Sequence, residues 1–431
     1  MGKERKIRLS QTMIVKNEED NIESALSWGR DIVFEQIVVD TGSTDRTVAI
    51  AKKSGAKVVY FDWIDDFAAA KNHAIEECKG DWIAILDADE YFSEEDSGKL
   101  MGIIEKADKE GYCAIETGWV NVDGKGGVID RYTQIRIIKN NKDLRYKRRI
   151  HEILDFKPGQ MAYDASKDLN IIHTGYIEEV AHSKNKRERN LKLLLKELEV
   201  NRNDPEILGY IADDYAFDDN DKAIYYYREA INQLPKKVDR KDARTATTFT
   251  KLIILLSLEN RTSEVKDICS IAEEKMPDNS NFIYYTGLYF YNIKDYKTAA
   301  GYYREAFEKF KAQNGKYSEL WADKLALAYA QYGHIFLETG DIKGAVAVEG
   351  SVLRSNKKEY LALKTLLKAF SLSKVPDHMV IDYLEKVYDL SQPLDKLLLY
   401  KASVESDLGG VKEHIYNLLD DKEKAVISKS V

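Results

Sequence analysis

The chain has 431 residues, of which 44% are apolar and 32% are charged, and its formal net charge is −8. A single hydrophobic core stops growing well below this length, so two or three domains are expected, and the composition excludes disorder as the main state. The acidic balance argues against a general nucleic-acid-binding protein.

No apolar run approaches the roughly 18 residues that cross a bilayer, and residues 1–10 lack the apolar core of a signal peptide. The three cysteines, Cys78, Cys113 and Cys269, are far apart and form no CxxC pair. This spacing excludes a disulfide framework and a structural zinc site. These features predict a cytoplasmic protein without a transmembrane segment, in which the cysteines are small core residues.

Short apolar runs alternate with helical patterns up to about residue 180. Strands are predicted by four runs, at residues 7–15, 36–39, 56–61 and 82–86. We expect Asn17 to cap the first helix and Ser43 or Thr44 to cap the second. Strands and helices that alternate at this spacing predict a Rossmann-like, mostly parallel sheet covered by helices on both faces.

Polar residues directly follow three of these predicted strands, namely Asn17, Asp40 and Asp87. Ligands of such sheets bind at the carboxyl ends of the strands, so we expect the three side chains on one rim. Asp40 there is suited to accept the N3–H of a uracil or the hydroxyls of a ribose, and its alternative role is to cap the next helix. Asp87-Ala88-Asp89 offers hard oxygen ligands for Mg²⁺ or Mn²⁺, although a lone DxD is also typical of a solvated turn.

The second half repeats itself at helical period. The segment DKAIYYYREAI at residues 221–231 recurs as YKTAAGYYREAF at residues 296–307, and a third match covers residues 332–348. These segments resemble tetratricopeptide repeats, which stack helical hairpins and present a concave surface. An unrelated helical bundle is the alternative. We expect domains at residues 1–180, 181–359 and 360–431, the last of which caps the array or pairs two subunits in a homodimer.

Four motifs in the first half carry a further resemblance. MIVKNEEDNIESAL, IVVDTGSTDRTVAIA, WIDDFAAAKNHAI and WIAILDADE, in this order, resemble the nucleotide-sugar-binding half of family 2 glycosyltransferases with the GT-A fold. The resemblance covers about residues 8–180 and implies a UDP-sugar donor and a Mn²⁺ or Mg²⁺ ion. It also implies site residues: for the nucleotide sugar, Val15, Asn17, Glu18, Asp40, Lys71, Asp87 and Arg136; for the metal, Asp89 and His173; and as catalytic base, Glu152.

A basic stretch lies beyond these motifs. Between Arg131 and Arg149 there are eight Lys or Arg residues and one acidic residue, Asp143. Such a stretch can stabilise the charge of a diphosphate leaving group or protect exposed strand edges from pairing. Arg136, which alternates with two isoleucines, is our candidate for the first role. His173 and Glu152 also admit purely structural roles.

Together these features predict a metal-dependent, inverting hexosyltransferase that moves a sugar from a UDP-sugar to a peptide, protein or surface-glycan acceptor. The resemblance extends to bacterial enzymes that glycosylate peptides or proteins, and the repeats would recognise the acceptor. Two alternatives remain: a noncatalytic scaffold with a degenerate transferase domain, and a nucleotidyltransferase. A nucleotidyltransferase would favour a glycine-rich, basic loop after the first strand. This sequence has KNEED there, which is acidic and contains no glycine.

Overall fold

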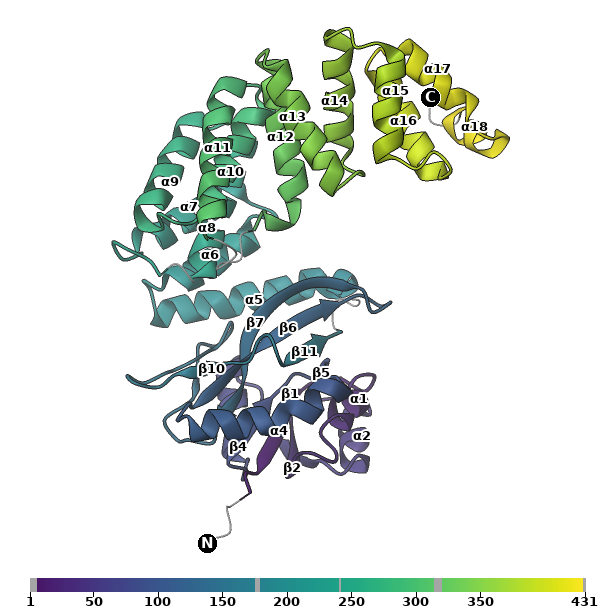
Figure 1. The fold of residues 1–431 in the computed structure, drawn as a ribbon. Coiled ribbons are helices and arrows are strands. Elements are labelled where there is room, and N and C mark those ends of the chain that lie inside the picture. The colour runs from purple at the N-terminus through teal and green to yellow at the C-terminus, as the bar shows by residue number, and fades with distance from the viewer. Residues whose placement is uncertain (1–5, 175–178, 240–241, 314–319, 429–431) are drawn as a thin grey trace. The chain divides into compact units, whose positions relative to one another are not determined.

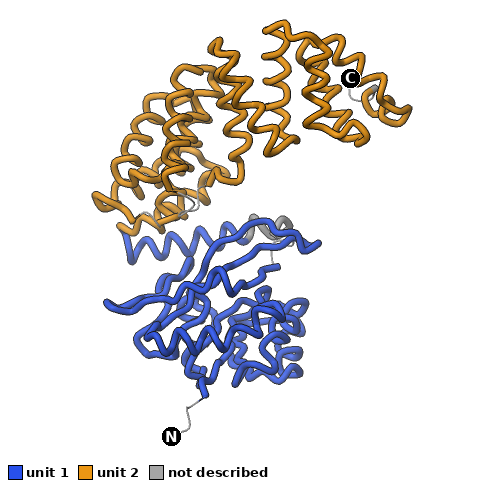
Figure 2. The backbone as a smooth tube through the Cα atoms, in the orientation of Figure 1, with its two compact units in different colours: residues 1–202 blue, residues 203–431 orange. Residues whose placement is uncertain are grey.

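The computed structural model describes residues 6–174, 179–239, 242–313 and 320–428. The chain divides into two compact units, residues 1–202 and residues 203–431, which we call unit 1 and unit 2 (Figures 1 and 2). None of the described helices is both long and apolar enough to cross a membrane.

The described residues of unit 1 form a mixed sheet of nine strands. The strand order is β3-β2-β1-β4-β7-β6-β11-β5, and β10 pairs with β6. Five of the eight strand pairs are parallel, whereas β7 runs antiparallel to β4 and β6, and β5 runs antiparallel to β11. The strands are β1 (Leu9–Val15), β2 (Glu35–Asp40), β3 (Lys57–Tyr60), β4 (Trp82–Ile85), β5 (Glu90–Phe92), β6 (Ala114–Val122), β7 (Val128–Lys139), β10 (Ala162–Asp164) and β11 (Asn170–His173). The predicted α/β fold with a mostly parallel sheet is confirmed.

Helices cover both faces of this sheet, as β4 shows. Trp82 and Ala84 pack in the same core cluster as α4, whereas Ile83 and Ile85 pack in the cluster of α3. Successive side chains of a strand point to opposite faces, so a strand covered on both sides is apolar throughout. The remaining elements of unit 1 are α1 (Ile22–Ser27), α2 (Thr47–Lys53), α3 (Phe67–Glu76), α4 (Glu94–Lys109), α5 (Glu179–Val200) and the hairpin of β8 (Tyr146–Lys147) and β9 (Ile153–Leu154).

The helix caps differ from those expected for the first two helices. The N-cap of α1 is Asn21 and that of α2 is Arg46, and neither side chain makes a capping hydrogen bond. The predicted caps Asn17, Ser43 and Thr44 are therefore wrong. The Asn17 side chain instead bonds to Thr44, and the Ser43 hydroxyl accepts the backbone N–H of Asn17.

Unit 2 is an array of helical hairpins. Its described helices are α6 (Pro205–Tyr215), α7 (Asn220–Asn232), α8 (Ala243–Leu258), α9 (Thr262–Lys275), α10 (Asn281–Asn292), α11 (Tyr296–Gln313), α12 (Leu325–Glu338), α13 (Ile342–Ser355), α14 (Tyr360–Leu372), α15 (Asp377–Val387), α16 (Pro393–Glu405), α17 (Gly409–Asn417) and α18 (Asp421–Ser428). The hairpins α6–α7, α8–α9, α10–α11 and α12–α13 follow one another along the chain. The predicted helical repeat region is confirmed.

Two of the second helices, α7 and α11, bury the same pattern of side chains. In α11 the buried residues Ala299, Tyr303 and Ala306 lie four and three positions apart, and α7 repeats the pattern with Tyr227 at its centre. Tyr303 packs closely against α10, as Gly287 shows. A Cβ added at Gly287 would lie only 3.1 Å from Tyr303 Cδ2. This close approach of two helices explains a glycine inside a helix.

Helix α5 belongs to unit 1. Its Glu197 carboxylate accepts the backbone N–H of Arg149 at 3.0 Å, and Lys196 Nζ lies 2.6 Å from Asp65 Oδ2. The two units therefore divide after residue 202 and not near residue 180. The expected further division at residue 359 stays a prediction.

Candidate active site

The loops after β1 and β2 are joined at the carboxyl edge of the sheet. Asn17 has a left-handed backbone conformation, with φ of 59°, and its Oδ1 accepts the backbone N–H of Thr44 at 2.8 Å. The Asn17 N–H in turn donates to Ser43 Oγ at 2.9 Å. Strand ends that are neighbours in the sheet are thus fixed to each other, and the structure brings the loops of Asn17 and Asp40 together.

Asp40 shapes the turn that follows β2. It is 4% exposed, and its carboxylate accepts the backbone N–H groups of Gly42 and Ser43, each at 3.2 Å. The carbonyl of Val15 accepts both the N–H and the hydroxyl of Thr41 at 3.0 Å. These contacts give Asp40 and Val15 structural roles at the rim, beside any role in ligand binding.

Glu18 lies in the same group of loops. Its Oε2 accepts from Asn21 Nδ2 at 2.9 Å, and its backbone N–H donates to Thr47 Oγ1 at 2.7 Å. The structure therefore places Val15, Asn17, Glu18 and Asp40 at one rim, as expected from the strand ends.

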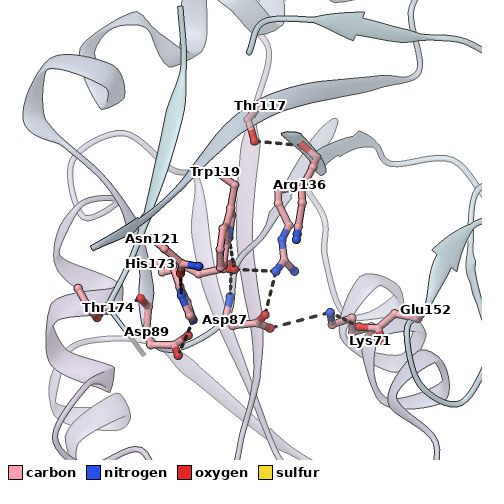
Figure 3. A network of polar contacts seen from close by, with 12 residues as sticks. Lys71, Asp87, Asp89, Thr117, Trp119, Asn121, Arg136, Glu152, His173 and Thr174 are labelled. Atoms are coloured by element: carbon pink, nitrogen blue, oxygen red, sulfur yellow. Dashed lines mark hydrogen bonds and ion pairs between the residues drawn. The ribbon is translucent and has the colours of Figure 1, made fainter. Parts of the chain in front are cut away.

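A row of alternating charges is centred on Asp87, which follows β4, the neighbour of β1 in the sheet (Figure 3). Lys71 Nζ contacts Glu152 Oε1 and lies 3.9 Å from Asp87 Oδ1. Arg136 Nη2 lies 3.0 Å from Asp87 Oδ2 and 2.6 Å from Glu90 Oε1. We call the five residues Glu152, Lys71, Asp87, Arg136 and Glu90 the charge row.

Most of the charge row is buried. Lys71 is 6% exposed, Arg136 7% and Glu90 1%, whereas the side chain of Asp87 keeps 38% of its surface. A buried ion needs a partner of opposite charge, and the alternation gives each ion one or two. Asp87 is the member that solvent or a ligand can reach.

These surroundings shift the protonation equilibria of the row. Burial favours the protonated form of Asp87, but the cations Lys71 and Arg136 outweigh burial and hold the pKa of Asp87 below its usual range. Burial likewise opposes ionisation of Glu152, but Lys71 lowers the pKa of this carboxyl. In Glu90 burial prevails over Arg136 and raises the pKa. Asp87 and Glu152 are therefore carboxylates near neutral pH.

The ammonium group of Lys71 lies within the charge row, beside an aromatic ring. This group contacts Glu152 and lies 5.4 Å from the centroid of the Tyr146 ring. Glu152 is the last residue of the loop between β8 and β9, in which Arg148 and His151 have positive φ values of 74° and 50°. Left-handed backbone at residues other than glycine costs energy and persists where the surroundings impose it, often at functional sites.

Asp89 and His173 converge on the other side of Asp87. His173 Nε2 lies 3.1 Å from Asp89 Oδ2, and His173 Nδ1 lies 2.5 Å from Asn121 Oδ1. The Asp89 carbonyl accepts the N–H and the hydroxyl of Thr174, at 3.0 and 3.2 Å. Burial lowers the pKa of His173, but the hydrogen bond to Asp89 reverses this effect and raises it overall.

The pair Asp89 and His173 suits a divalent cation. In the part of the chain that the structure describes, no group of three or more His, Cys, Asp or Glu side chains is arranged around a metal site. A carboxylate oxygen and an imidazole nitrogen that face each other are suitable ligands for Mn²⁺, which can complete its shell with diphosphate oxygens and water. The residues present therefore fit a metal held jointly by the protein and a ligand.

Three residues of this site were missed by the sequence analysis. Glu90 bonds to Arg136 and accepts the N–H of Asp87 at 2.9 Å, Trp119 stacks on His173, and Asn121 bonds to it. Glu90 directly follows the DxD motif in the sequence DADE, and Asn121 is a polar residue in the otherwise apolar WVNV of β6. Both are weak signals without the fold.

Comparison with known proteins identifies the class of unit 1. Residues 10–170 match the model of "Glycosyl transferase family 2". Unit 1 therefore contains a family 2 glycosyltransferase domain, as the resemblance implied, and the chain combines it with tetratricopeptide-like helical repeats.

Curated relatives match parts of the chain. A TPR repeat-containing protein of Synechococcus elongatus is 36% identical over 148 residues, which cover 34% of this chain and 36% of that protein. The SPbeta prophage-derived glycosyltransferase SunS of Bacillus subtilis is 26% identical over 268 residues, 62% of each chain. The matches span about one third to three fifths of these relatives' lengths. Among solved structures, Staphylococcus aureus TarS (residues 1–349) with UDP-GlcNAc is 15% identical, with a TM-score of 0.35, and covers 61% of this chain and 88% of that chain.

Proposed function

We propose that the protein is a metal-dependent, inverting glycosyltransferase that moves a sugar from a UDP-sugar to a peptide, protein or glycan acceptor. The observation that carries the proposal is the convergence of Asp87, Asp89, His173 and Arg136 at the carboxyl edge of the sheet in a family 2 domain. The similarity to SunS, named as a glycosyltransferase, supports the same reaction class.

The donor side is assigned to the rim and the metal pair. Asp89 and His173 would hold Mn²⁺ or Mg²⁺, which supplies positive charge to the leaving diphosphate. Asp40, with Val15, Asn17 and Glu18 around it, would hold the nucleoside. Asp87, the exposed member of the charge row, faces the ribose and the metal-bound waters in this assignment.

Arg136 and Lys71, the two cations of the charge row, have the same proposed roles but bind through different head groups. Arg136 and Lys71 keep Asp87 ionised and oriented, and both add fixed positive charge near the diphosphate. A guanidinium forms two parallel hydrogen bonds where an ammonium group acts as a point charge, so Lys71 contributes charge and not a bidentate contact.

The acceptor side is assigned to Glu152 and unit 2. Glu152 is ionised and can take the proton that the acceptor loses as the new glycosidic bond forms. The helical repeats would hold a peptide, protein or glycan acceptor on their surface.

A donor-hydrolysis screen tests this function. The full chain is incubated with UDP-, GDP- and dTDP-sugars, with Mn²⁺ or with a chelator, and the free nucleotide is measured. We expect turnover of UDP-sugars that stops with the chelator. Turnover that is insensitive to the chelator, or the absence of turnover with every sugar nucleotide, would contradict the proposal.

A further inference from the structure

The imidazole ring of His173 is fixed by three neighbours. Asn121 Oδ1 lies 2.5 Å from Nδ1, and Asp89 Oδ2 lies 3.1 Å from Nε2. One ring face stacks on Trp119, with centroids 4.3 Å apart and planes at 27° (Figure 3). Rotation of the ring would break both hydrogen bonds and the stacking contact.

Strand β6 supplies two of these neighbours. His173 pairs with Asn121 in the parallel ladder of β11 and β6, and Trp119 lies two positions earlier on β6, on the same face. Both side chains are buried, Asn121 at 4% exposure and Trp119 at 5%. The Trp119 Nε1–H also donates to Glu90 Oε1 at 2.7 Å, which anchors the indole ring to the charge row.

Each ring nitrogen of His173 faces an oxygen that accepts hydrogen bonds. The amide oxygen of Asn121 and the carboxylate of Asp89 cannot donate, so the protonated imidazole donates from Nδ1 to Asn121 and from Nε2 to Asp89. A divalent cation between Nε2 and Asp89 would replace the Nε2 proton, and the Nδ1–H would still donate to Asn121. A histidine binds a metal through such an unprotonated nitrogen while its other N–H donates to a neighbouring oxygen.

We propose that Asn121 is a positioning residue that holds the Nδ1–H side of the His173 ring and so presents Nε2 to a divalent cation shared with Asp89. The inference rests on the proposed function, in which Asp89 and His173 hold the metal. Trp119 contributes by stacking on the imidazole ring of His173, which restricts tilting of that ring.

The first test needs no metal. The full chain is labelled with ¹⁵N-histidine, the His173 signals are assigned by comparison with His173→Gln, and the exchange of the Nδ1 proton with solvent is followed at a pH at which the imidazole is protonated. We expect slow exchange in the wild type, where Asn121 accepts this proton, and faster exchange in Asn121→Leu. Asn121→Asp keeps an acceptor oxygen and should also exchange slowly. Equal exchange rates in the wild type and Asn121→Leu would overturn the inference.

The second test measures Mn²⁺ affinity by electron paramagnetic resonance in the presence of UDP. Asn121→Leu should bind Mn²⁺ roughly 10–100-fold more weakly than the wild type, and Asn121→Asp should recover most of the loss. Thr117→Val is the matched control, because it removes the hydrogen bond from Thr117 Oγ1 to the Gln134 carbonyl on the same strand and leaves His173 untouched. Its affinity should equal that of the wild type.

The outcomes separate the inference from the proposed function. Wild-type Mn²⁺ affinity in Asn121→Leu, or an equal loss in Thr117→Val, would overturn the role of Asn121. A wild type that binds no Mn²⁺ would overturn metal dependence, while the exchange of the Nδ1 proton would still decide whether Asn121 holds the His173 ring.

Discussion

Asp87 is held between two cations that come from distant parts of the chain. Lys71 lies on α3 and Arg136 on β7, and their outer partners are Glu152 and Glu90. Removing one member of such a row leaves a buried charge without its partner, which is costly. The arrangement therefore fixes the position of Asp87 more strictly than its exposed surface suggests.

The role proposed for Glu152 can be separated from its ion pair with Lys71. Glu152→Gln has nearly the same shape but cannot take a proton, so sugar transfer should fall roughly 10²–10⁴-fold while UDP affinity changes little. Single-turnover rates with saturating donor measure this effect.

The same substitution in a Lys71→Met background is the control. If Glu152 acts as a base, Glu152→Gln should still cause a large loss when Lys71 is absent. Equal rates for Lys71→Met and the double variant would show that Glu152 serves only to neutralise Lys71.

For single residues, the sequence predicted where a side chain lies in the sheet better than which other side chains it contacts. Asn17, Asp40 and Asp87 follow strands, and strand ends are local features that periodicity locates. The contact between Lys71 and Glu152 depends on the turn between β8 and β9, which residue spacing does not predict. The roles of Asn121 and Trp119 likewise depend on the pairing of β6 with β11.

Helix α13 departs from the pattern that α7 and α11 share. Its buried residues Ala345, Glu349 and Val352 have the spacing of Ala299, Tyr303 and Ala306 in α11, so a glutamate occupies the place of a tyrosine. Glu349 is 0% exposed, and among the described residues neither of its carboxyl oxygens has a hydrogen-bond partner.

Gly333 on α12 makes room for this side chain, because a Cβ there would lie 2.5 Å from Glu349 Oε1. Burial raises the pKa of Glu349 to about 9, with a smaller contribution from Glu359. The carboxyl is therefore neutral in the folded protein near pH 7, whereas the unfolded chain would be ionised.

This difference predicts a stability that depends on pH. Below the ordinary pKa of 4.5, Glu349 is protonated in both the folded and the unfolded protein, so it does not make the free energy of unfolding depend on pH. Between pH 4.5 and 9 the unfolded state alone releases the proton, so Glu349 lowers the free energy of unfolding by about 1.4 kcal/mol per pH unit. Glu349→Gln should thus match the wild type at pH 4 and exceed its stability by about 3 kcal/mol at pH 7.

Urea unfolding of the full chain, followed by circular dichroism between pH 4 and pH 8, measures this difference. Glu308→Gln, at an exposed position of α11, is the control and should show no growing difference. A Glu349→Gln protein whose stability stays parallel to that of the wild type across this range would contradict the assigned protonation state.

The whole chain joins an α/β unit to a helical array, and both were predictable from periodicity. Buried parallel strands read as continuous apolar runs, and helical hairpins repeat their packing residues. The antiparallel insertion of β7 between β4 and β6 was not predictable, since these pairings join segments that local patterns do not relate. Helix α5 has the same helical period as unit 2, and its contacts with Arg149 and Asp65 assign it to unit 1.

The division into unit 1 and unit 2 predicts that UDP binding and sugar transfer to the acceptor can be separated in a fragment. A fragment of residues 1–202 should bind UDP as the full chain does but transfer poorly to the native acceptor, because the repeats would supply acceptor contacts and not donor chemistry. Calorimetry with UDP and transfer assays measure the two properties.

A fragment of residues 1–180 is the matched control. It lacks nearly all of α5, which holds Arg149 and Asp65, and should unfold more readily than residues 1–202. Full transfer activity in the fragment of residues 1–202 would refute the proposed role of unit 2.

The most direct test of the proposed function is Mn²⁺-stimulated hydrolysis of a UDP-sugar by Asp89→Asn. The substitution keeps the shape of the side chain but removes the charge that would bind the metal beside His173. We predict that the metal-stimulated rate is lost while the circular dichroism spectrum is unchanged, and that Asp143→Asn, at an exposed acid, retains the wild-type rate. Metal-stimulated hydrolysis at the wild-type rate in Asp89→Asn would contradict this assignment.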